Sequence, residues 1–143
     1  MTDHYKISKI LSMNDTGETS SHQAGILIPK EEKILDFFPQ LNPEEKNPRV
    51  LIEFQDDSSK SWKFNFIYYN NKFFGGTRNE FRLTGMTRFI NSNNLKAGDE
   101  IFLERDFENR YYIRYKKSKI ISAEKQESGT KIRLSSKWRV ISF

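Results

Sequence analysis

The chain has 143 residues, a formal net charge of +5 and no cysteine, which excludes disulfides and thiolate metal sites and fits a reducing cytoplasm. Aromatic residues make up 14% of the sequence, with only 7 glycines and 4 prolines, and this composition excludes a disordered chain and favours a β-rich globule. No apolar run reaches the length of a membrane span and the first four residues do not begin a signal peptide, so we expect a cytoplasmic protein.

Charge is distributed unevenly along the chain. Residues 1–59 contain 6 Lys or Arg and 11 Asp or Glu, whereas residues 60–143 contain 18 and 8. A basic half of this kind is typical of a surface that binds a polyanion such as nucleic acid. The excess of basic residues could equally keep a β-rich protein soluble and protect its edge strands from pairing.

The chain begins with a predicted strand followed by a long polar loop. Residues 5–12 alternate so that Tyr5, Ile7 and Lys9 share one face. Residues 13–23 are rich in turn formers, and ordered loops of this length are uncommon unless they have a function.

The remaining pattern predicts a strand-rich barrel. Residues 24–28 form a short apolar strand, buried on both faces, which could make a hairpin with the first strand. Proline and turn signals bound two short helices, at 30–38 and 84–91. We expect one domain over residues 1–143 with seven to nine strands, and so many strands favour a closed or half-closed barrel. Further strands are expected at 49–55, 61–69, 101–105, 110–117 and 138–143, with a hairpin at 118–125 and 130–134, so that 118–143 is a C-terminal extension.

The strand at 61–69 has the clearest alternation in the sequence. Trp62, Phe64, Phe66 and Tyr68 fall on one face and are expected to fill the core. The alternative is an exposed aromatic ladder, in which Trp62, Tyr68 and Tyr69 stack on the bases of single-stranded DNA or RNA.

Residues 75–82 combine a glycine hinge with a short polar strand. Alternation places Arg78, Glu80 and Arg82 on one face. Arginine donates to the O6 and N7 atoms of guanine and glutamate accepts from N4 of cytosine, so this face suits the edges of G·C pairs. The alternative is a solvated edge strand with an internal Arg–Glu ion pair.

The second half of the polar loop offers partners for a nucleic acid. Ser20 and Ser21 supply small hydroxyls, His22 an imidazole and Gln23 an amide, all of which bind phosphates or base edges. A single histidine in a surface loop often has no function, so both interpretations of His22 remain open.

Residues that could support catalysis are scarce. Two histidines without cysteines or spaced carboxylates do not form a zinc site, and the sequence has no phosphate-binding glycine loop and no nucleophile elbow. Residues 31–33 and 44–46 mimic the Glu-x-Lys half of a metal-dependent nuclease site, without the Pro-Asp partner on a strand. We therefore expect a binding domain and not an enzyme; a cryptic nuclease using Glu32 and Glu45 is the alternative.

Two stretches, in the same order, resemble the N-terminal effector domain of the EcoRII restriction endonuclease. They are LSMNDTGETSSHQAGILIP at 11–29 and FGGTRNEFR at 74–82. The stretches RLTGMTRF at 82–89 and LKAGD at 95–99, with Phe102, resemble the plant B3 DNA-binding domain, which shares its fold with the EcoRII domain.

The resemblance covers residues 5–117 and implies a mainly β fold. This fold is a seven-stranded open β-barrel, the B3-like DNA-binding pseudobarrel, with two short flanking helices. Two projecting segments of such a domain grip the major groove, and here they would be the loop ending at His22 and Gln23 and the strand 78–82. The implied partner is double-stranded DNA, and no cofactor is implied.

The EcoRII family recognises the short site CCWGG, and its effector domain controls a separate nuclease domain of the same polypeptide. The resemblance therefore implies the regulatory domain of a bacterial, type IIE-like restriction endonuclease with a CCWGG-like site, monomeric as an isolated domain. We expect the nuclease domain, the only part that would need Mg²⁺, to be absent from this chain.

The resemblance also implies roles for individual residues. Family positions match at Lys9, His22, Arg78, Asn79, Glu80 and Arg82, and they depart at Gly76 and Phe81, where lysine is expected, and at Leu27, where tyrosine is expected. These departures remove phosphate contacts and thus affinity more than site choice. In the resulting hypothesis Arg78 and Arg82 donate to guanines, Glu80 accepts from cytosine, and Asn79 binds an adjacent base or fixes the strand. His22 and Gln23 contact the other half of the site. Phosphates are held by Ser20, Ser21 and Thr77, and positive charge is supplied by Lys9 and Lys72.

Overall fold

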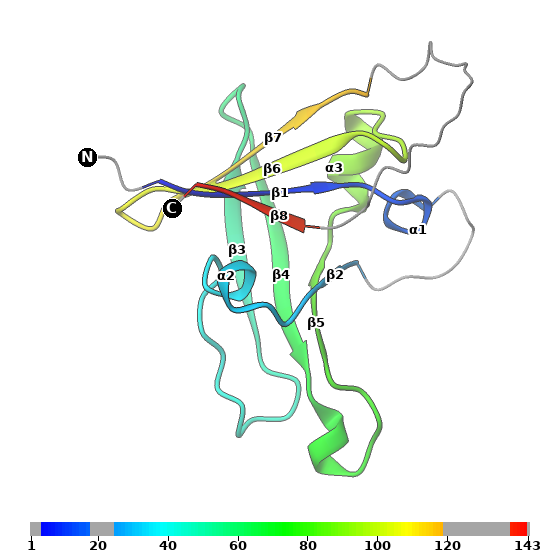
Figure 1. Ribbon diagram of the computed structural model, residues 1–143, viewed down its shortest axis with the longest axis vertical. Coiled ribbons are helices and arrows are strands. Elements are labelled where there is room, and N and C mark those ends of the chain that lie inside the picture. Colours follow the sequence, from blue (N-terminus) through cyan, green and yellow to red (C-terminus); the bar gives the residue numbers. More distant parts are fainter. Residues whose placement is uncertain (1–3, 18–24, 119–137, 143) are drawn as a thin grey trace.

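The computed structural model describes residues 4–17, 25–118 and 138–142. Its strands form one eight-stranded sheet in the order β2-β5-β4-β3-β7-β6-β1-β8, which curls into a nearly closed barrel (Figure 1). The mainly β fold predicted from the sequence is confirmed, and the eighth strand is the one expected at the C-terminal end. The strands are β1 (Tyr5–Ile10), β2 (Ile26–Ile28), β3 (Arg49–Gln55), β4 (Ser61–Tyr69), β5 (Glu80–Thr84), β6 (Glu100–Arg105), β7 (Tyr111–Lys116) and β8 (Trp138–Ser142).

The described part of the chain has four short helices between these strands. They are α1 (Met13–Thr16), α2 (Glu32–Leu35), the 3-10 helix η1 (Asn71–Phe74) and α3 (Thr87–Ser92). Within the described ranges, no helix is long and apolar enough to cross a membrane.

A short parallel strand pairing and one hydrogen bond from an indole ring give the sheet its barrel shape. Strands β3 and β7 join the two halves of the sheet through a short parallel pairing that places Phe54 opposite Tyr111. The two edge strands, β2 and β8, meet where Nε1 of Trp138 donates to the carbonyl oxygen of Leu27 at 2.9 Å. Trp138 is also buried, so the residue that joins the two edge strands packs in the core as well.

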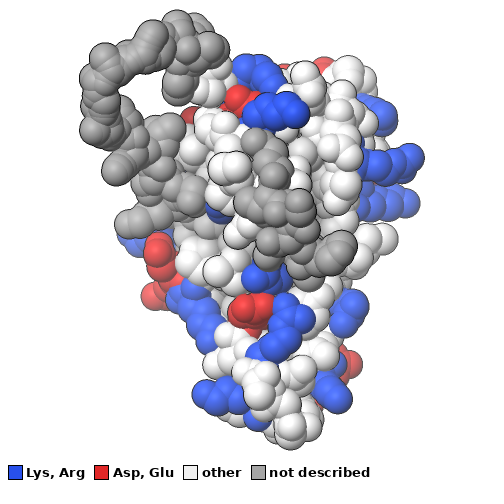
Figure 2. Space-filling view, turned by 90° about the vertical axis from the view of Figure 1, so that its right-hand side faces the viewer, with Lys and Arg blue, Asp and Glu red and all other residues white. Residues whose placement is uncertain are grey.

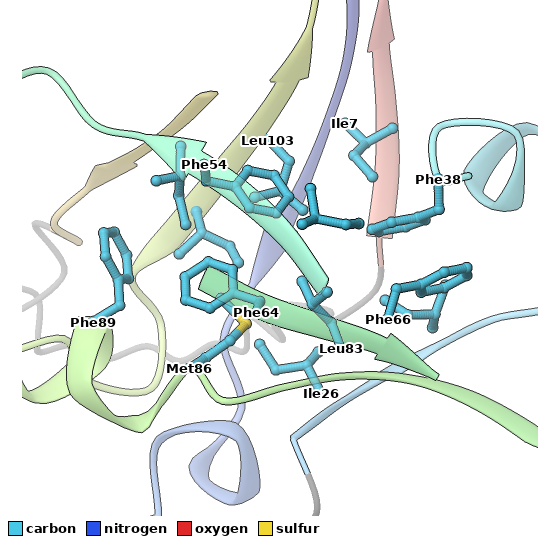
Figure 3. Close-up of a cluster of buried hydrophobic side chains, with 14 of the residues drawn as sticks. Ile7, Ile26, Phe38, Phe54, Phe64, Phe66, Leu83, Met86, Phe89 and Leu103 are labelled. Carbon is cyan, nitrogen blue, oxygen red and sulfur yellow. The ribbon is translucent and has the colours of Figure 1, made fainter. Parts of the chain in front are cut away.

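The aromatic strand β4 fills the barrel. Trp62, Phe64 and Phe66 are buried, and Tyr68 is half-buried near the end of the strand. Figure 3 shows Phe64 and Phe66 among side chains from several strands, with Phe66 near Phe38; the rings of Phe66 and Phe38 are stacked with centroids 4.4 Å apart. Burial of one such ring contributes about 1.5–3 kcal/mol, so this strand supplies a large part of the core energy.

Helix α3 closes one end of the barrel with apolar side chains. Met86, Phe89 and Ile90 are buried, as the helical spacing predicted. The ring of Phe89 meets that of Trp62 edge to face, with centroids 5.1 Å apart. The helix thereby fixes the end of β5, the strand that carries Glu80 and Arg82.

Two expectations for the first strands are wrong. β1 pairs with β6 and β8, and β2 pairs with β5, so β1 and β2 do not form a hairpin. β2 is also not buried on both faces, because Leu27 is 47% exposed between the buried residues Ile26 and Ile28. The physical reason is that β2 is an edge strand of the curled sheet, with one face toward the core and one toward solvent.

Local structure differs from the expected boundaries in three places. Helix α2 covers only 32–35 of the expected 30–38, the expected loop 13–23 begins with α1, and α3 covers 87–92 where a helix was expected at 84–91. Ser12 caps α1 in a capping box with Asp15, a short-range signal that the turn-rich composition concealed. The hairpin expected within 118–134 lies outside the described residues, apart from Ser118.

A carboxylate organises the turn between β3 and β4. Asp56 accepts hydrogen bonds from the backbone N–H groups of Ser58 and Lys60, at 2.8 and 3.0 Å, and from Nε1 of Trp62 at 2.9 Å. Burial by itself raises the pKa of Asp56, but these hydrogen bonds outweigh it and lower the pKa to about 2.

The turn between β6 and β7 repeats this arrangement. Asp106 accepts from the backbone N–H groups of Glu108 and Arg110, both at 2.9 Å, and from Nε of Arg110 and the hydroxyl of Tyr112. Burial again raises the pKa of this carboxyl, and the hydrogen bonds again lower it to about 2. Both hairpins therefore depend on an ionised carboxylate.

Acid should destabilise the fold through these two turns. Their pKa values are about 2 in the folded protein against an ordinary 3.8, so their stabilisation is complete above pH 3.8 and is lost as the pH falls toward 2. We expect Asp56→Asn and Asp106→Asn to lower the melting temperature at pH 7 and to flatten its fall between pH 4 and pH 2. Thermal unfolding followed by circular dichroism across this range measures both effects.

Asp57→Asn is the matched control, because the Asp57 side chain is 81% exposed and lies next to Asp56. It should follow the wild-type profile. An equal acid response in the Asp56 and Asp57 variants would contradict the assigned role of the turn.

Candidate nucleic-acid interface

Residues 70–82, called here the second arm, comprise the connection from β4 to β5 and the first three residues of β5, and they project from the barrel. Figure 1 shows η1 and the following turn at the lower end of the molecule, beyond the other strands. The arm is closed by two hydrogen bonds between its sides: N–H of Lys72 donates to the carbonyl of Arg78 at 2.9 Å, and N–H of Arg78 donates to Oδ1 of Asn71 at 2.7 Å. Gly75 ends η1 at φ +92°, a left-handed conformation that glycine adopts without strain.

A buried asparagine fixes the base of the second arm. Asn70 is fully buried, and its Oδ1 accepts from N–H of Asn47 at 2.6 Å. Its Nδ2 donates to the carbonyls of Pro43 and Glu45, at 3.2 and 2.8 Å. The loop before β3 is thereby attached to the root of the arm, so the arm's direction is set by the barrel.

One face of the second arm carries a triad of charges, defined as Arg78, Glu80 and Arg82. Oε2 of Glu80 lies 2.5 Å from Nη2 of Arg78 and 2.9 Å from Nε of Arg82. The three residues therefore share a face, as the alternation predicted. The hydrogen bond from Arg78 is the main reason that the pKa of Glu80 is lowered, and Arg82 acts in the same direction against the effect of burial. Glu80 is thus an anion at neutral pH.

Both arginines of the triad also contact the barrel. The guanidinium carbon of Arg78 lies 3.9 Å from the ring centroid of Tyr69, a cation–π contact. Nη1 of Arg82 donates to the carbonyl of Gly25 at 3.0 Å. Gly25 lies so close to β5 that a Cβ there would be 2.2 Å from the carbonyl oxygen of Leu83, so only glycine permits this approach. The guanidinium groups are consequently held in fixed positions.

The predicted residues around the triad occupy different places. Oδ1 of Asn79 accepts from the hydroxyl of Tyr68 at 2.7 Å, which gives Asn79 a role in fixing the arm. Lys72 and Thr77 are exposed near the tip, where they are accessible to a ligand. Ser20, Ser21, His22 and Gln23 lie outside the described residues.

Lys9 is placed in the barrel wall and not at its surface. It is 6% exposed, and its ammonium lies 2.7 Å from Oδ2 of Asp15. The same Oδ2 accepts from N–H of Ser12 at 2.9 Å, so Lys9 binds the first turn of α1 to β1. Since α1 opens the 13–23 segment, Lys9 holds the root of that segment. The face that Lys9 shares with Ile7 was a sequence signal for this burial, although Ser8 on the other face is buried as well.

A hollow of about 620 Å³ lies beside the triad, and it was not predicted from the sequence. It is bounded by α1, Gly25, strands β3 to β5 and the start of α3. Arg49, Asn65 and Tyr69 bring polar groups to it from β3 and β4. Asn65 and Tyr69 alternate with the core aromatics of β4, so the sequence predicted that they point outward. Their position near α1 could not be predicted, because it depends on tertiary structure. In Figure 2, which views the molecule from this side, basic side chains flank an acidic group in the lower half.

The sequence of the chain matches the family described as restriction endonuclease EcoRII, N-terminal, over residues 1–100. The chain belongs to this family. It is 40% identical over 87 residues to the type II restriction enzyme EcoRII of Escherichia coli, an alignment that covers 57% of this chain and 21% of that enzyme. It is also 27% identical over 108 residues to the B3 domain-containing transcription factor NGA2 of Arabidopsis thaliana, covering 74% of this chain and 33% of that protein. The chain therefore spans a fifth to a third of these relatives.

Solved structures show the same fold. The Arabidopsis FUS3–DNA complex superposes with a TM-score of 0.60 at 26% identity, covering 78% of this chain and 95% of that one. The Arabidopsis thaliana transcription factor LEC2, also solved with DNA, superposes with a TM-score of 0.57 at 20% identity, covering 80% and 95%. The predicted resemblance to the EcoRII N-terminal domain and to B3 domains is confirmed.

Two of the three expected departures from the EcoRII pattern lie on the second arm, and the third lies on β2. Phe81, where lysine was expected, stacks on the ring of Tyr68 with centroids 4.2 Å apart and planes 6° apart. Gly76 is exposed at the tip, and Leu27 is exposed on β2. An aromatic contact thus occupies a position where the resemblance implied a lysine, and it stiffens the arm there.

The Lys9–Asp15 pair gives a test that separates scaffold from DNA contact. We expect Lys9→Met to destabilise the fold by about 3–5 kcal/mol, because it leaves a buried carboxylate without its partner. Lys9→Met combined with Asp15→Asn should recover most of this loss, since both charges are then removed. Denaturant unfolding of the two variants and of Lys6→Met, a control on the same strand, provides the measurement.

A different result would contradict this structural role and show that Lys9 contacts a DNA phosphate. It would consist of an unchanged free energy of unfolding for Lys9→Met together with a salt slope of DNA binding that is about one unit smaller.

Proposed function

We propose that this chain binds double-stranded DNA sequence-specifically, with two segments, 13–23 and the second arm, entering the major groove. The observation that carries the proposal is the triad: two guanidinium groups and a carboxylate on one face of a projecting arm. The major groove is about 12 Å wide and admits a two-stranded β ribbon, which is what the base of the second arm resembles. The B3 fold and the EcoRII family membership support the same function.

The chemistry of the triad matches G·C base pairs. A guanidinium has five N–H donors and binds O6 and N7 of guanine as a fork, while a carboxylate accepts from N4 of cytosine. Contact with phosphates alone would be opposed by Glu80, whose negative charge repels the backbone. Its place between two arginines therefore favours base recognition, with each good bidentate contact contributing about 1–3 kcal/mol of discrimination.

Other residues complete the proposed interface. His22 and Gln23 contact the other half of the site, and Ser20, Ser21 and Thr77 bind phosphates. Lys72 supplies exposed positive charge at the arm, whereas Lys9 contributes by holding α1. Asn79 fixes the second arm through Tyr68.

The wider role follows from the family. We propose that the chain is the regulatory effector domain of a bacterial, type IIE-like restriction endonuclease that recognises a CCWGG-like site in the cytoplasm. In this proposal the chain is a monomeric binding module without a cofactor, and catalysis with Mg²⁺ belongs to a nuclease domain of the same polypeptide. Binding-site selection from random duplexes would test the site without a prior assumption about it.

Single-stranded DNA or RNA is the second candidate ligand, and the described contacts disfavour it. Trp62 is buried, Tyr68 stacks on Phe81, and the ring of Tyr69 carries the Arg78 guanidinium. The three proposed stacking rings are therefore engaged within the protein. Competition between duplex and single-stranded oligonucleotides of the selected sequence separates the two ligands, and a preference for the single strand would reject the duplex proposal.

Arg82 provides the direct test of base recognition. We expect Arg82→Ala to weaken binding to the selected duplex by about 1–3 kcal/mol and to reduce the preference over random DNA, because a bidentate contact to guanine is lost. Arg114→Ala, a half-exposed arginine on β7, is the matched control and should bind as wild type. Equal weakening of selected and random duplexes by Arg82→Ala, measured by gel shift, would exclude a base-recognition role.

Lys72 provides the complementary test of phosphate binding. Its exposed ammonium should neutralise one phosphate, so Lys72→Ala should weaken selected and random duplexes alike and lower the salt slope by roughly one unit. Lys60→Ala, in the β3–β4 turn at the opposite end of the molecule (Figure 1), is the control. A salt titration of Kd gives the slope, and an unchanged slope would remove Lys72 from the contact set.

A further inference from the structure

The tip of the second arm presents two adjacent phenylalanines to solvent. Phe73 is 63% exposed and Phe74 is 43% exposed, and both belong to η1. Two large apolar side chains exposed next to each other at the end of a projecting arm are typical of a surface that contacts a ligand. The proposed function above leaves this pair without a role.

The tip is rigidly connected to the charged face of the arm. N–H of Lys72 donates to the carbonyl of Arg78, and N–H of Phe73 donates to the carbonyl of Asn70 at 3.0 Å. Lys72, the residue before Phe73, is therefore hydrogen-bonded to the backbone of Arg78. Because Lys72 of η1 is bonded to Arg78, we expect an arm that brings Arg78 to the edge of a base pair to place the η1 tip at a neighbouring step of the same groove.

The major groove offers such a ring one apolar group. Phosphates are charged, and the edges of guanine, adenine and cytosine carry hydrogen-bonding atoms, whereas thymine adds a C5-methyl group that phenylalanine contacts. The nearby cation is also suited to DNA: Nζ of Lys72 lies 5.9 Å from the centroid of the Phe73 ring, so the apolar tip has a phosphate-binding charge beside it.

We propose that Phe73 and Phe74 form a thymine-methyl contact that adds an A·T preference beside the G·C contacts of the triad. This inference rests on the proposed function, because it requires the second arm to lie in the major groove. It assigns two residues to the A·T pair that a CCWGG-like site contains next to its guanines, a pair that the triad does not recognise.

Replacing thymine by uracil tests the contact on the unmodified protein, because this change removes only the methyl group. Each thymine of the selected duplex is replaced in turn and Kd is measured. We expect one position to weaken binding about fourfold, the effect of exposing roughly one methyl group. The variants Phe73→Ala and Phe74→Ala identify the ring: at least one should bind the thymine and uracil duplexes equally.

Phe107→Ala is the matched control, since Phe107 is 69% exposed in the β6–β7 turn, which Figure 1 shows away from the arm. It should retain the full thymine-to-uracil ratio. The inference is overturned if no thymine position changes Kd, or if the ratio survives in both arm variants. Those outcomes differ from failure of the proposed function, in which the wild-type chain shows no duplex preference or Arg82→Ala leaves the preference intact.

Discussion

One carboxylate determines the geometry of the candidate interface. Glu80 binds Arg78 and Arg82 through the same oxygen, so two flexible side chains are held on one face of the second arm before any ligand arrives. Ordering a long side chain costs conformational entropy when it occurs on binding, and here that cost is met during folding. In the proposed complex the arginines would meet the groove already oriented.

Contacts with the barrel hold the two arginines and the base of the arm in position. The ring of Tyr69 supports Arg78, the Gly25 carbonyl holds Arg82, and buried Asn70 fixes the base of the arm. Each of these groups belongs to, or adjoins, a strand whose other residues pack in the core. A change in the core would therefore alter the position of the charged face, although the two are on opposite sides of the sheet.

The second arm contains a group that weakens its attraction to phosphates and groups that make it rigid. Glu80 cancels part of the attraction that the arginines have for phosphates, which lowers affinity for DNA in general and raises the share of base recognition in the proposed complex. Phe81 stiffens the arm, because it stacks on Tyr68 at a position where the resemblance implied a lysine. Tyr68 in turn binds Asn79, so aromatic packing and hydrogen bonding hold the arm in shape.

The sequence alone determined the features that depend on local periodicity. Alternation over 61–69 gave the core face of β4, and alternation over 78–82 gave the shared face of the triad, because neighbouring side chains of a strand always point to opposite sides. The family resemblance added the fold. Tertiary structure decided what distant residues do together: β1 pairs with β6 and β8 and not with β2, Lys9 is buried against Asp15, and Arg49 and Asn65 meet α1 around a hollow. These contacts could not be predicted because strand order and the closure of the barrel by Trp138 depend on the energy of the whole core, to which each local pattern contributes only a part.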